Sequence, residues 1–185
     1  MAIADLLQIS VDELLSNEKS EKKQSDYIYE SRTEYDIDGK KNFDIKLGGA
    51  YAVDLKAYHG EKIEVAMFSN VYKNLLADYK VKIDDIKNRI DIDLNRFNEA
   101  SEADAKESLV ITIFIPVKYI GKIELSVNAG TLNITDIENE HIEVNGKISE
   151  VTLQGNKSEI EIDSNLDMQI SVLSHEGALE INQLS

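Results

Sequence analysis

A short apolar–acidic–apolar triplet recurs four times in the C-terminal part of the chain. The copies begin at residues 123, 142, 160 and 179, so consecutive copies are 19, 18 and 19 residues apart. In full they read Ile123-Glu124-Leu125, Ile142-Glu143-Val144, Ile160-Glu161-Ile162 and Leu179-Glu180-Ile181. In a strand, the two apolar side chains of such a triplet lie on one face and the acid on the other. A fixed period of this length predicts stacked β-coils, because no coil can cover its own apolar face.

A second short alternation follows each of the first three triplets, nine or ten residues after it begins. These stretches read Leu132-Asn133-Ile134, Val151-Thr152-Leu153 and Ile170-Ser171-Val172. We therefore expect two short strands in each coil.

Strand-like alternation also fills the chain before the triplets. It covers residues 43–47, 52–57, 63–67, 79–83 and 90–94, and residues 109–117 are so apolar that both faces of that strand are predicted to be buried. Tyr58 to Glu61 predicts a hairpin turn, and Asp84 to Asn88 a second turn. A short helical turn is expected within residues 71–78, and an exposed loop or brief helix within residues 97–108. The predicted fold is mostly β: an irregular antiparallel β segment continues into a single-chain β-solenoid with coils of about 19 residues.

The first residues of the chain have a helical pattern instead. Ser10 and Glu13 have the spacing of a capping box, and Ile9 and Leu14 that of a hydrophobic staple. Residues 17–25 contain no apolar side chain and are typical of a solvated linker. We therefore divide the chain into a short helical piece (residues 1–16), a linker (17–26) and a β domain (27–185).

The helical piece resembles the end of a lambda-repressor-like (Xre-type) helix-turn-helix domain. The matching positions are Ala4, Leu6, Leu7, Ser10, Asp12, Glu13, Leu14 and Leu15. The recognition helix of such domains lies upstream of this phrase. The resemblance therefore implies a remnant that reaches DNA only through a missing upstream domain. A plain capped helix that packs on the β domain is the alternative.

The β domain resembles the bacterial adhesin-like β-solenoid domain family over residues 27–185. The resemblance rests on an apolar strand that ends in proline, Ile113 to Pro116, followed by Ile123 to Ile134 with its Ala129-Gly130 step. It implies an architecture of stacked strands and a binding role, and it implies no catalytic residue or cofactor.

The charge and composition narrow the possible partners. The formal net charge is −15, which repels the phosphate backbones of nucleic acids and anionic membranes. The chain has no cysteine, which rules out disulfides and thiolate metal sites. It shows neither an apolar run that could span a bilayer nor a signal peptide after Met1. We therefore expect a cytoplasmic protein, or one of the cell envelope if an upstream signal or anchor was removed.

Three groups of polar residues are candidate chemical sites. Glu34, Asp36, Asp38 and Gly39 begin like a calcium loop, but the twelfth position, which needs a glutamate, is Ile45. Asp84, Asp85, Asp91 and Asp93 could cluster across a hairpin, although their alternation favours a solvated face. His59, His141 and His175 are too widely spaced for a zinc motif. We therefore predict no catalytic, metal or cofactor residue and no enzymatic activity.

The repeated glutamates are the remaining candidate. Stacked coils would align Glu124, Glu143, Glu161 and Glu180 as a ladder of like charge, with lysines 122, 147 and 157 nearby to relieve it. Such a ladder either solubilises the outer face or binds cations or a basic partner.

The sequence thus favours a non-enzymatic binding or assembly module with a protein partner or self-association. In the first interpretation, the chain is the C-terminal sensory or scaffold domain of a helix-turn-helix regulator. The alternative is a cell-envelope adhesin-like protein that binds a surface polymer or protein. An enzyme that acts on carbohydrate along the solenoid face is the third hypothesis.

Overall fold

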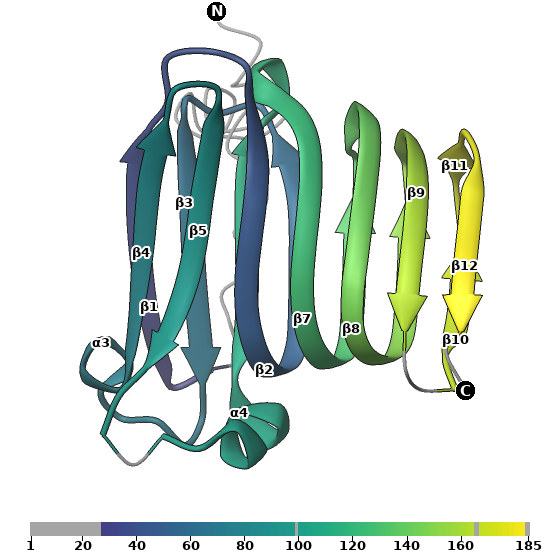
Figure 1. Ribbon diagram of the computed structural model, residues 1–185. Helices are drawn as coiled ribbons and strands as arrows, with labels where there is room; N and C mark the ends of the chain where they lie inside the picture. Colours follow the sequence, from purple (N-terminus) through teal and green to yellow (C-terminus); the bar gives the residue numbers. More distant parts are fainter. Residues whose placement is uncertain (1–26, 99, 165–166, 184–185) are drawn as a thin grey trace, which may run out of the picture.

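The computed structural model describes residues 27–98, 100–164 and 167–183, which are mostly β-strands (Figure 1). The strands are β1 (Tyr29–Asp36), β2 (Lys41–Tyr58), β3 (Lys62–Ser69), β4 (Tyr79–Ile86), β5 (Arg89–Arg96), β6 (Val110–Pro116), β7 (Ile120–Thr135), β8 (Glu138–Gln154), β9 (Asn156–Ser164), β10 (Gln169–Val172), β11 (His175–Glu176) and β12 (Leu179–Gln183). The helices are α3 (Leu75–Asp78), α4 (Glu102–Ser108) and the 3-10 turn η1 (Val117–Tyr119). The predicted helical piece and linker, residues 1–26, lie outside the described residues.

The described strands form one open sheet of 12 strands, so the mostly β prediction is confirmed. Its main order is β1-β3-β6-β2-β7-β8-β9-β11, with β10 on β8, β12 on β9, and the β4–β5 hairpin on β2. The pairs β1–β3, β3–β6 and β4–β5 are antiparallel. However, β2 pairs in parallel with β5, β6 and β7. The first half is therefore a mixed sheet, whereas the sequence predicted an antiparallel one.

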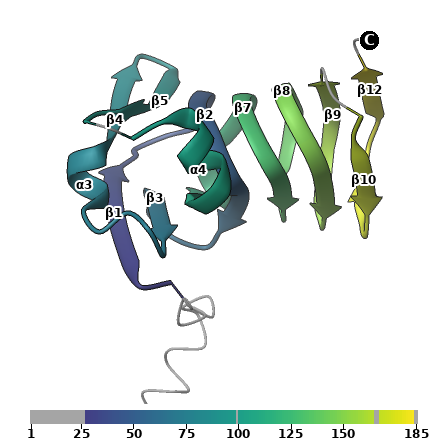
Figure 2. The same cartoon turned by 90° about the horizontal axis from the view of Figure 1, so that it is seen from below.

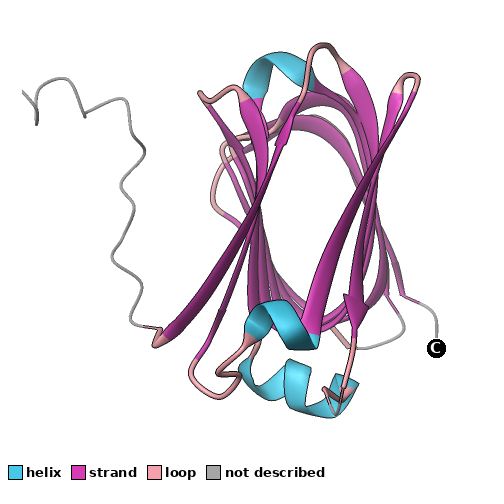
Figure 3. Ribbon diagram, turned by 90° about the vertical axis from the view of Figure 1, so that its left-hand side faces the viewer, coloured by secondary structure: helices cyan, strands magenta, loops and turns pink. Residues whose placement is uncertain are grey.

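The sheet folds into two walls that face each other (Figure 3). The front wall, nearest the viewer in Figure 1, comprises β4, β5, β9, β12 and the first parts of β2, β7 and β8. The back wall comprises β1, β3, β6, β10 and the last parts of β2, β7 and β8. A strand whose two parts belong to different walls must bend between them. At the bend of β8, Gly146 has a φ of +148°, and a Cβ there would lie 1.8 Å from the Val127 carbonyl oxygen. Only glycine fits this bend without displacing the neighbouring strand.

The repeated triplets lie side by side in the front wall. Ile123 pairs with Ile142, Ile142 with Ile160, and Ile160 with Leu179, all in parallel register. Ile123 and Ile142 are fully buried between the walls, and Ile160 is nearly so. Burying a side chain of this size stabilises a fold by about 1.5–3 kcal/mol. The sequence period thus corresponds to the register of neighbouring parallel strands.

The predicted hairpin at Tyr58 to Glu61 is wrong. This segment connects β2 to β3, but β6 lies between these two strands and pairs with both. Phe114 of β6, for example, is opposite Lys56 on one side and Glu64 on the other. The central place suits β6, because both of its faces are largely buried as predicted. The second predicted turn does join a hairpin, β4–β5, with Lys87 at a φ of 56°.

The two short helices lie near the ends of the strands. The helical turn expected within residues 71–78 is α3, and the brief helix expected within residues 97–108 is α4. Ser101 caps α4 by accepting a hydrogen bond from the Asp104 amide (3.1 Å), and Ala105 is fully buried. Seen from below, α4 lies beside β2 (Figure 2).

Candidate binding surface on the front wall

A row of seven carboxylates crosses the outer face of the front wall, one from each of seven neighbouring strands. Its members, in spatial order, are Asp84, Asp91, Asp44, Glu124, Glu143, Glu161 and Glu180. Each is in direct register with the next, so neighbours lie about one strand spacing, ~4.8 Å, apart along the row. Six of the seven sit between two apolar residues that point into the core. The alternation of each strand therefore fixes the carboxylates on the outer face.

Three cations neutralise the N-terminal half of this row. Lys46 Nζ lies 2.9 Å from Asp44, and Arg89 Nε lies 2.6 Å from Asp91. Lys82 pairs with Asp84 on the same strand. Each of these ion pairs raises the pKa of the lysine or arginine involved, chiefly through its hydrogen bond to the carboxylate. The half of the row built by β4, β5 and β2 is therefore close to electrically neutral.

The C-terminal half has amide partners in place of cations. Asn145 Nδ2 donates to Glu143 (2.8 Å), and Asn182 Nδ2 lies 3.3 Å from Glu161 and 3.4 Å from Glu180. Asp163 adds a further carboxylate in the neighbouring row, where Asn145 and Asn182 are its register partners. We name these five carboxylates the anionic patch: Glu124, Glu143, Glu161, Asp163 and Glu180. Within residues 27–98, 100–164 and 167–183, no lysine or arginine forms an ion pair with any of them.

The lysines expected to relieve this charge do not do so. Lys122 lies 3.2 Å from Glu140, and Lys157 lies 3.9 Å from Glu138, both near the turn between β7 and β8. Lys147 forms no ion pair with the patch in the described part of the chain. The predicted glutamate ladder is thus present, but its predicted neutralisation is not. Like charges at this spacing repel one another, and a cationic partner would remove that repulsion.

The other candidate sites are dispersed or already paired. Glu34 and Asp36 lie on the edge strand β1, where Lys62 reaches both (3.2 and 3.7 Å). Ile45, the twelfth position of the calcium-like loop, is fully buried. Asp85 is 2.9 Å from Lys41, and Asp93 faces Lys82 across the β4–β5 hairpin. No group of three or more His, Asp or Glu side chains in the described residues could hold a metal ion.

The three histidines lie on three different elements. His59 is exposed in the turn after β2, His141 is half-buried in β8, and His175 is on β11. His59 lines a groove near the turns of the sheet, together with Lys40, Lys118, Asp136 and Asn139. Lys157 and Glu138, which also line this groove, form an ion pair at 3.9 Å. The groove therefore brings together no two histidines and no unpaired charge cluster.

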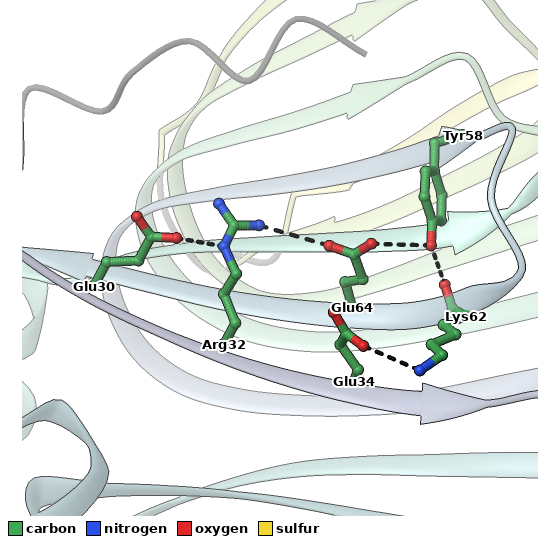
Figure 4. A network of polar contacts seen from close by, with 6 residues as sticks. All are labelled: Glu30, Arg32, Glu34, Tyr58, Lys62 and Glu64. Carbon is green, nitrogen blue, oxygen red and sulfur yellow. Dashed lines mark hydrogen bonds and ion pairs between the residues drawn. The ribbon is translucent and has the colours of Figure 1, made fainter. Parts of the chain in front are cut away.

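The back wall carries a second polar network, in which the charges alternate (Figure 4). Arg32 pairs with Glu30 on its own strand and lies 3.6 Å from Glu64 on β3. Tyr58 donates hydrogen bonds to the Lys62 carbonyl and to Glu64 (3.3 Å). Burial, together with the nearby Glu64 carboxylate, raises the pKa of Tyr58 to about 12. This network joins β1, β2 and β3 and places a cation beside each of its carboxylates, so its role is structural.

Sequence reasoning named four members of the row as a ladder, considered Asp84 and Asp91 only as part of a separate cluster across a hairpin, and missed Asp44. Asp44 and Asp91 occur in the same kind of triplet as the glutamates, Phe43-Asp44-Ile45 and Ile90-Asp91-Ile92. They do not follow the 19-residue period, because β2 and β5 join the front wall through irregular connections. A search for apolar–acid–apolar triplets without a fixed period would have found both.

Comparisons of sequence and of structure gave different results. No protein-family profile and no curated protein sequence matches the chain. Among solved structures, it is similar to a putative cell adhesion protein from Clostridium sporogenes, with 8% identity, a TM-score of 0.44, and coverage of 83% of this chain and 97% of that one. It is also similar to a putative adhesin from Parabacteroides merdae, with 10% identity, a TM-score of 0.31, and coverage of 85% and 97%. A putative adhesin from Bacteroides fragilis gives 11% identity, a TM-score of 0.32, and coverage of 85% and 98%. These proteins belong to the class that the sequence resemblance named, but at such scores we draw nothing from them about function.

Proposed function

We propose that this chain is a non-enzymatic binding module that holds a basic segment of a partner protein on its anionic patch. The observation that carries the proposal is the asymmetry of the carboxylate row. Its first half has an ion pair at every carboxylate, whereas among the described residues no lysine or arginine forms an ion pair with Glu124, Glu143, Glu161 or Glu180. Arg89 interacts with Glu124 only at longer range. A solubilising face needs only scattered charges, but this one aligns them on four adjacent strands.

The regular register of the patch suits a partner with repeated positive charges. Parallel strands in register fix the spacing of the backbone positions that carry the carboxylates, so the backbone of the patch is already ordered before binding. Opposite charge also accelerates encounter and favours basic over acidic partners. The same field disfavours contact with nucleic acid phosphates and with anionic lipid.

The fold supports a scaffold role for this patch. We infer that residues 120–183 form the stacked part of a single-chain β-solenoid, within a domain of residues 27–185. The parallel register of the four triplets supports this description. A rigid stack of strands is a suitable platform for a binding face, because its core fixes the outward side chains.

Of the two interpretations, only the adhesin-like alternative depends on residues that the structure describes. The regulator interpretation, and with it the cytoplasmic location, depends on residues 1–16, which lie outside the described part. Neither the fold nor the comparisons support a helix-turn-helix role. We therefore place the module, as a proposal, among adhesin-like proteins that act at the cell envelope. None of the described helices has the length and apolar character needed to cross a membrane.

A titration with an oligolysine peptide tests the proposal. We expect the full chain to bind the peptide at low salt, and the affinity to fall as added salt screens the patch. The E143Q/E161Q variant removes two central charges without changing the size of either side chain, and it should bind at least tenfold more weakly.

A control of equal charge separates a site from net acidity. The E107Q/E150Q variant changes two exposed glutamates outside the row, on α4 and on the last part of β8. It should bind as the parent does. Equal weakening by both variants would mean that the overall charge of −15 attracts the peptide, and the patch would not be a site.

A further inference from the structure

The C-terminal ends of both walls are uncovered. β10 is the last strand of the back wall and pairs only with β8, and β12 is the last strand of the front wall and pairs only with β9. Val172 is 50% exposed, although its register partner Leu153 is fully buried. Ile181 is likewise 44% exposed, whereas its partner Ile162 is fully buried. These are core positions of the repeat from which the next layer is absent in the described part of the chain.

At the opposite end of the sheet, which we call the closed end, side chains cover the core between the walls, although β1 and β4 are edge strands. There, Leu75 of α3 is 3% exposed and Tyr79 at the start of β4 is 1% exposed. The rings of Tyr72 and Tyr79 pack edge to face with centroids 5.1 Å apart. A second molecule that packed against the core at this end would displace these side chains. Head-to-tail stacking of copies is therefore disfavoured.

The two walls do not end at the same strand, and this difference determines which arrangement of two copies can join both walls. Starting from β2, the described front wall continues through β7, β8, β9 and β12, whereas the back wall continues through β7, β8 and β10. The front wall therefore ends one strand beyond the back wall. A two-fold rotation that exchanges the walls places the longer wall of one copy against the shorter wall of the other. Each of the two joined walls then contains the same number of strands, because each combines one longer and one shorter wall.

We propose that the C-terminal end is a dimer interface with a second copy of this chain, in which β10 pairs antiparallel with the partner copy's β12 at two equivalent seams. The contact is isologous, since each copy offers both strands. Its backbone hydrogen bonds extend the two walls by strand addition, and Val172, Leu173 and Ile181 become covered.

The charges agree with this pairing. β10 reads Gln169-Ile170-Ser171-Val172 and carries no charge, whereas β12 carries Glu180. Pairing β10 with β12 therefore places Glu180 opposite an uncharged strand. The other two-fold arrangement would pair β12 with β12, bring Glu180 close to Glu180 of the second copy, and leave a gap between the two β10 strands. The interface is small, and we expect a reversible dimer that dissociates on dilution.

Sedimentation velocity of the full chain over a concentration series tests the proposal. A monomer–dimer equilibrium is expected for the parent, and V172K/I181K should remain monomeric at every concentration. Both positions are half-exposed, so the variant should keep the parent melting temperature. The control is L76K, which changes a more exposed apolar side chain (70%) on α3 at the closed end and should leave the dimer intact. A parent that stays monomeric, a series of larger oligomers, or a dimer lost in L76K would each overturn the proposal.

Engineered cysteines test which strands meet, because the chain has no cysteine of its own. Under mild oxidation by dissolved oxygen, the S171C/E180C variant should form a disulfide-linked dimer, whereas S171C and E180C alone should not. A dimer linked by either single variant would mean that identical strands meet, and would contradict the β10–β12 pairing. This surface is separate from the anionic patch apart from Glu180, so E143Q/E161Q should dimerise normally even if the proposed partner binding fails.

Discussion

Glu143 and Glu161 are direct register partners on adjacent parallel strands, and an asparagine side chain stands beside each in place of a cation. The arrangement places two like charges about one strand spacing apart, ~4.8 Å. It persists because the core positions on either side of each glutamate are buried and fix the register. The unfavourable charge is therefore a consequence of the fold that a basic partner can relieve.

Removing this repulsion should not harm the fold. In E143Q/E161Q we expect the free energy of unfolding to change by no more than about 0.5 kcal/mol. Any gain should be larger at low salt, where the charges are less screened. Urea denaturation at two salt concentrations measures this. A loss beyond about 1 kcal/mol would show that the carboxylates stabilise the sheet, against the account given above.

Placing a charge between the walls should unfold the repeat. Ile142 is fully buried, and an unpaired buried carboxylate costs several kcal/mol, comparable with the whole stability of a domain. We therefore expect I142D to lose cooperative thermal melting. I181D is the control, because it places the same charge at the second apolar position of the last triplet, which is 44% exposed, and it should melt near the parent. Equal melting of I142D and the parent would refute the assignment of the triplets to the core.

Asn156 should be more important than its surface counterparts. It is 2% exposed, its Nδ2 donates to the Ile134 carbonyl (2.8 Å), and its Oδ1 accepts from the Ile137 amide (3.0 Å). N156A leaves both backbone groups without their side-chain partner and should cost about 1–3 kcal/mol of unfolding free energy. N145A, which removes a half-buried side chain, should cost less than about 0.5 kcal/mol. Chemical denaturation of the two variants would decide, and similar losses would contradict the structural role of Asn156.

Acid stability should depend on Glu102. The hydrogen bond from Asn128 (3.0 Å), together with Lys106 and Arg96 nearby, lowers the pKa of the Glu102 carboxyl. Because the folded-state pKa is depressed, its contribution is present above the ordinary value of 4.5 and is lost as pH falls through the lower folded value. E102Q should therefore show a smaller fall in unfolding free energy on acidification than the parent. Parallel pH profiles for the two proteins would exclude this linkage.

Alkaline stability should depend on Tyr58 with the opposite sign. Its pKa is raised to about 12, above the ordinary value of 10.0, so the folded protein keeps a proton that the unfolded chain releases. The contribution is complete below the unfolded value and is lost as pH rises from 10.0 towards the folded value. In Y58F, the decline of unfolding free energy over this interval should be smaller, and the phenol absorbance titration should lose a late component. An unchanged late component would mean that Tyr58 titrates normally.

The sequence predicted the local elements better than their partners. The triplet period anticipated the parallel neighbours Ile123, Ile142 and Ile160, because one period separates residues that must share a face of the core. The hairpin expected at Tyr58 failed for a different reason. Alternation identifies β2 and β3 as strands, but it carries no information that β6, far along the chain, inserts between them.

The candidate site was likewise predictable where a residue's own strand determines its position, and not where a distant strand does. The outward position of Glu143 follows from its own strand, so it could be predicted. The ion pairs of Lys46 with Asp44 and of Arg89 with Asp91 join residues two apart on one strand, so they follow from local spacing. The placement of these strands beside the glutamates could not be predicted, because no local pattern specifies that β2 lies between β5 and β7. The described patch residues lack ion pairs partly because Lys122 and Lys157 pair with Glu140 and Glu138 instead, which the sequence pattern does not specify.

The most direct test of the central claim is a residue-resolved NMR titration of the full chain with oligolysine. The account predicts that amide shifts concentrate on the front-wall parts of β7, β8, β9 and β12, around Glu124, Glu143, Glu161 and Glu180. The Asp44 and Asp91 region, with its ion-paired carboxylates, should change little. Shifts spread evenly over exposed acids on both walls, or centred on the ion-paired half of the row, would contradict the assignment of the anionic patch as the binding surface.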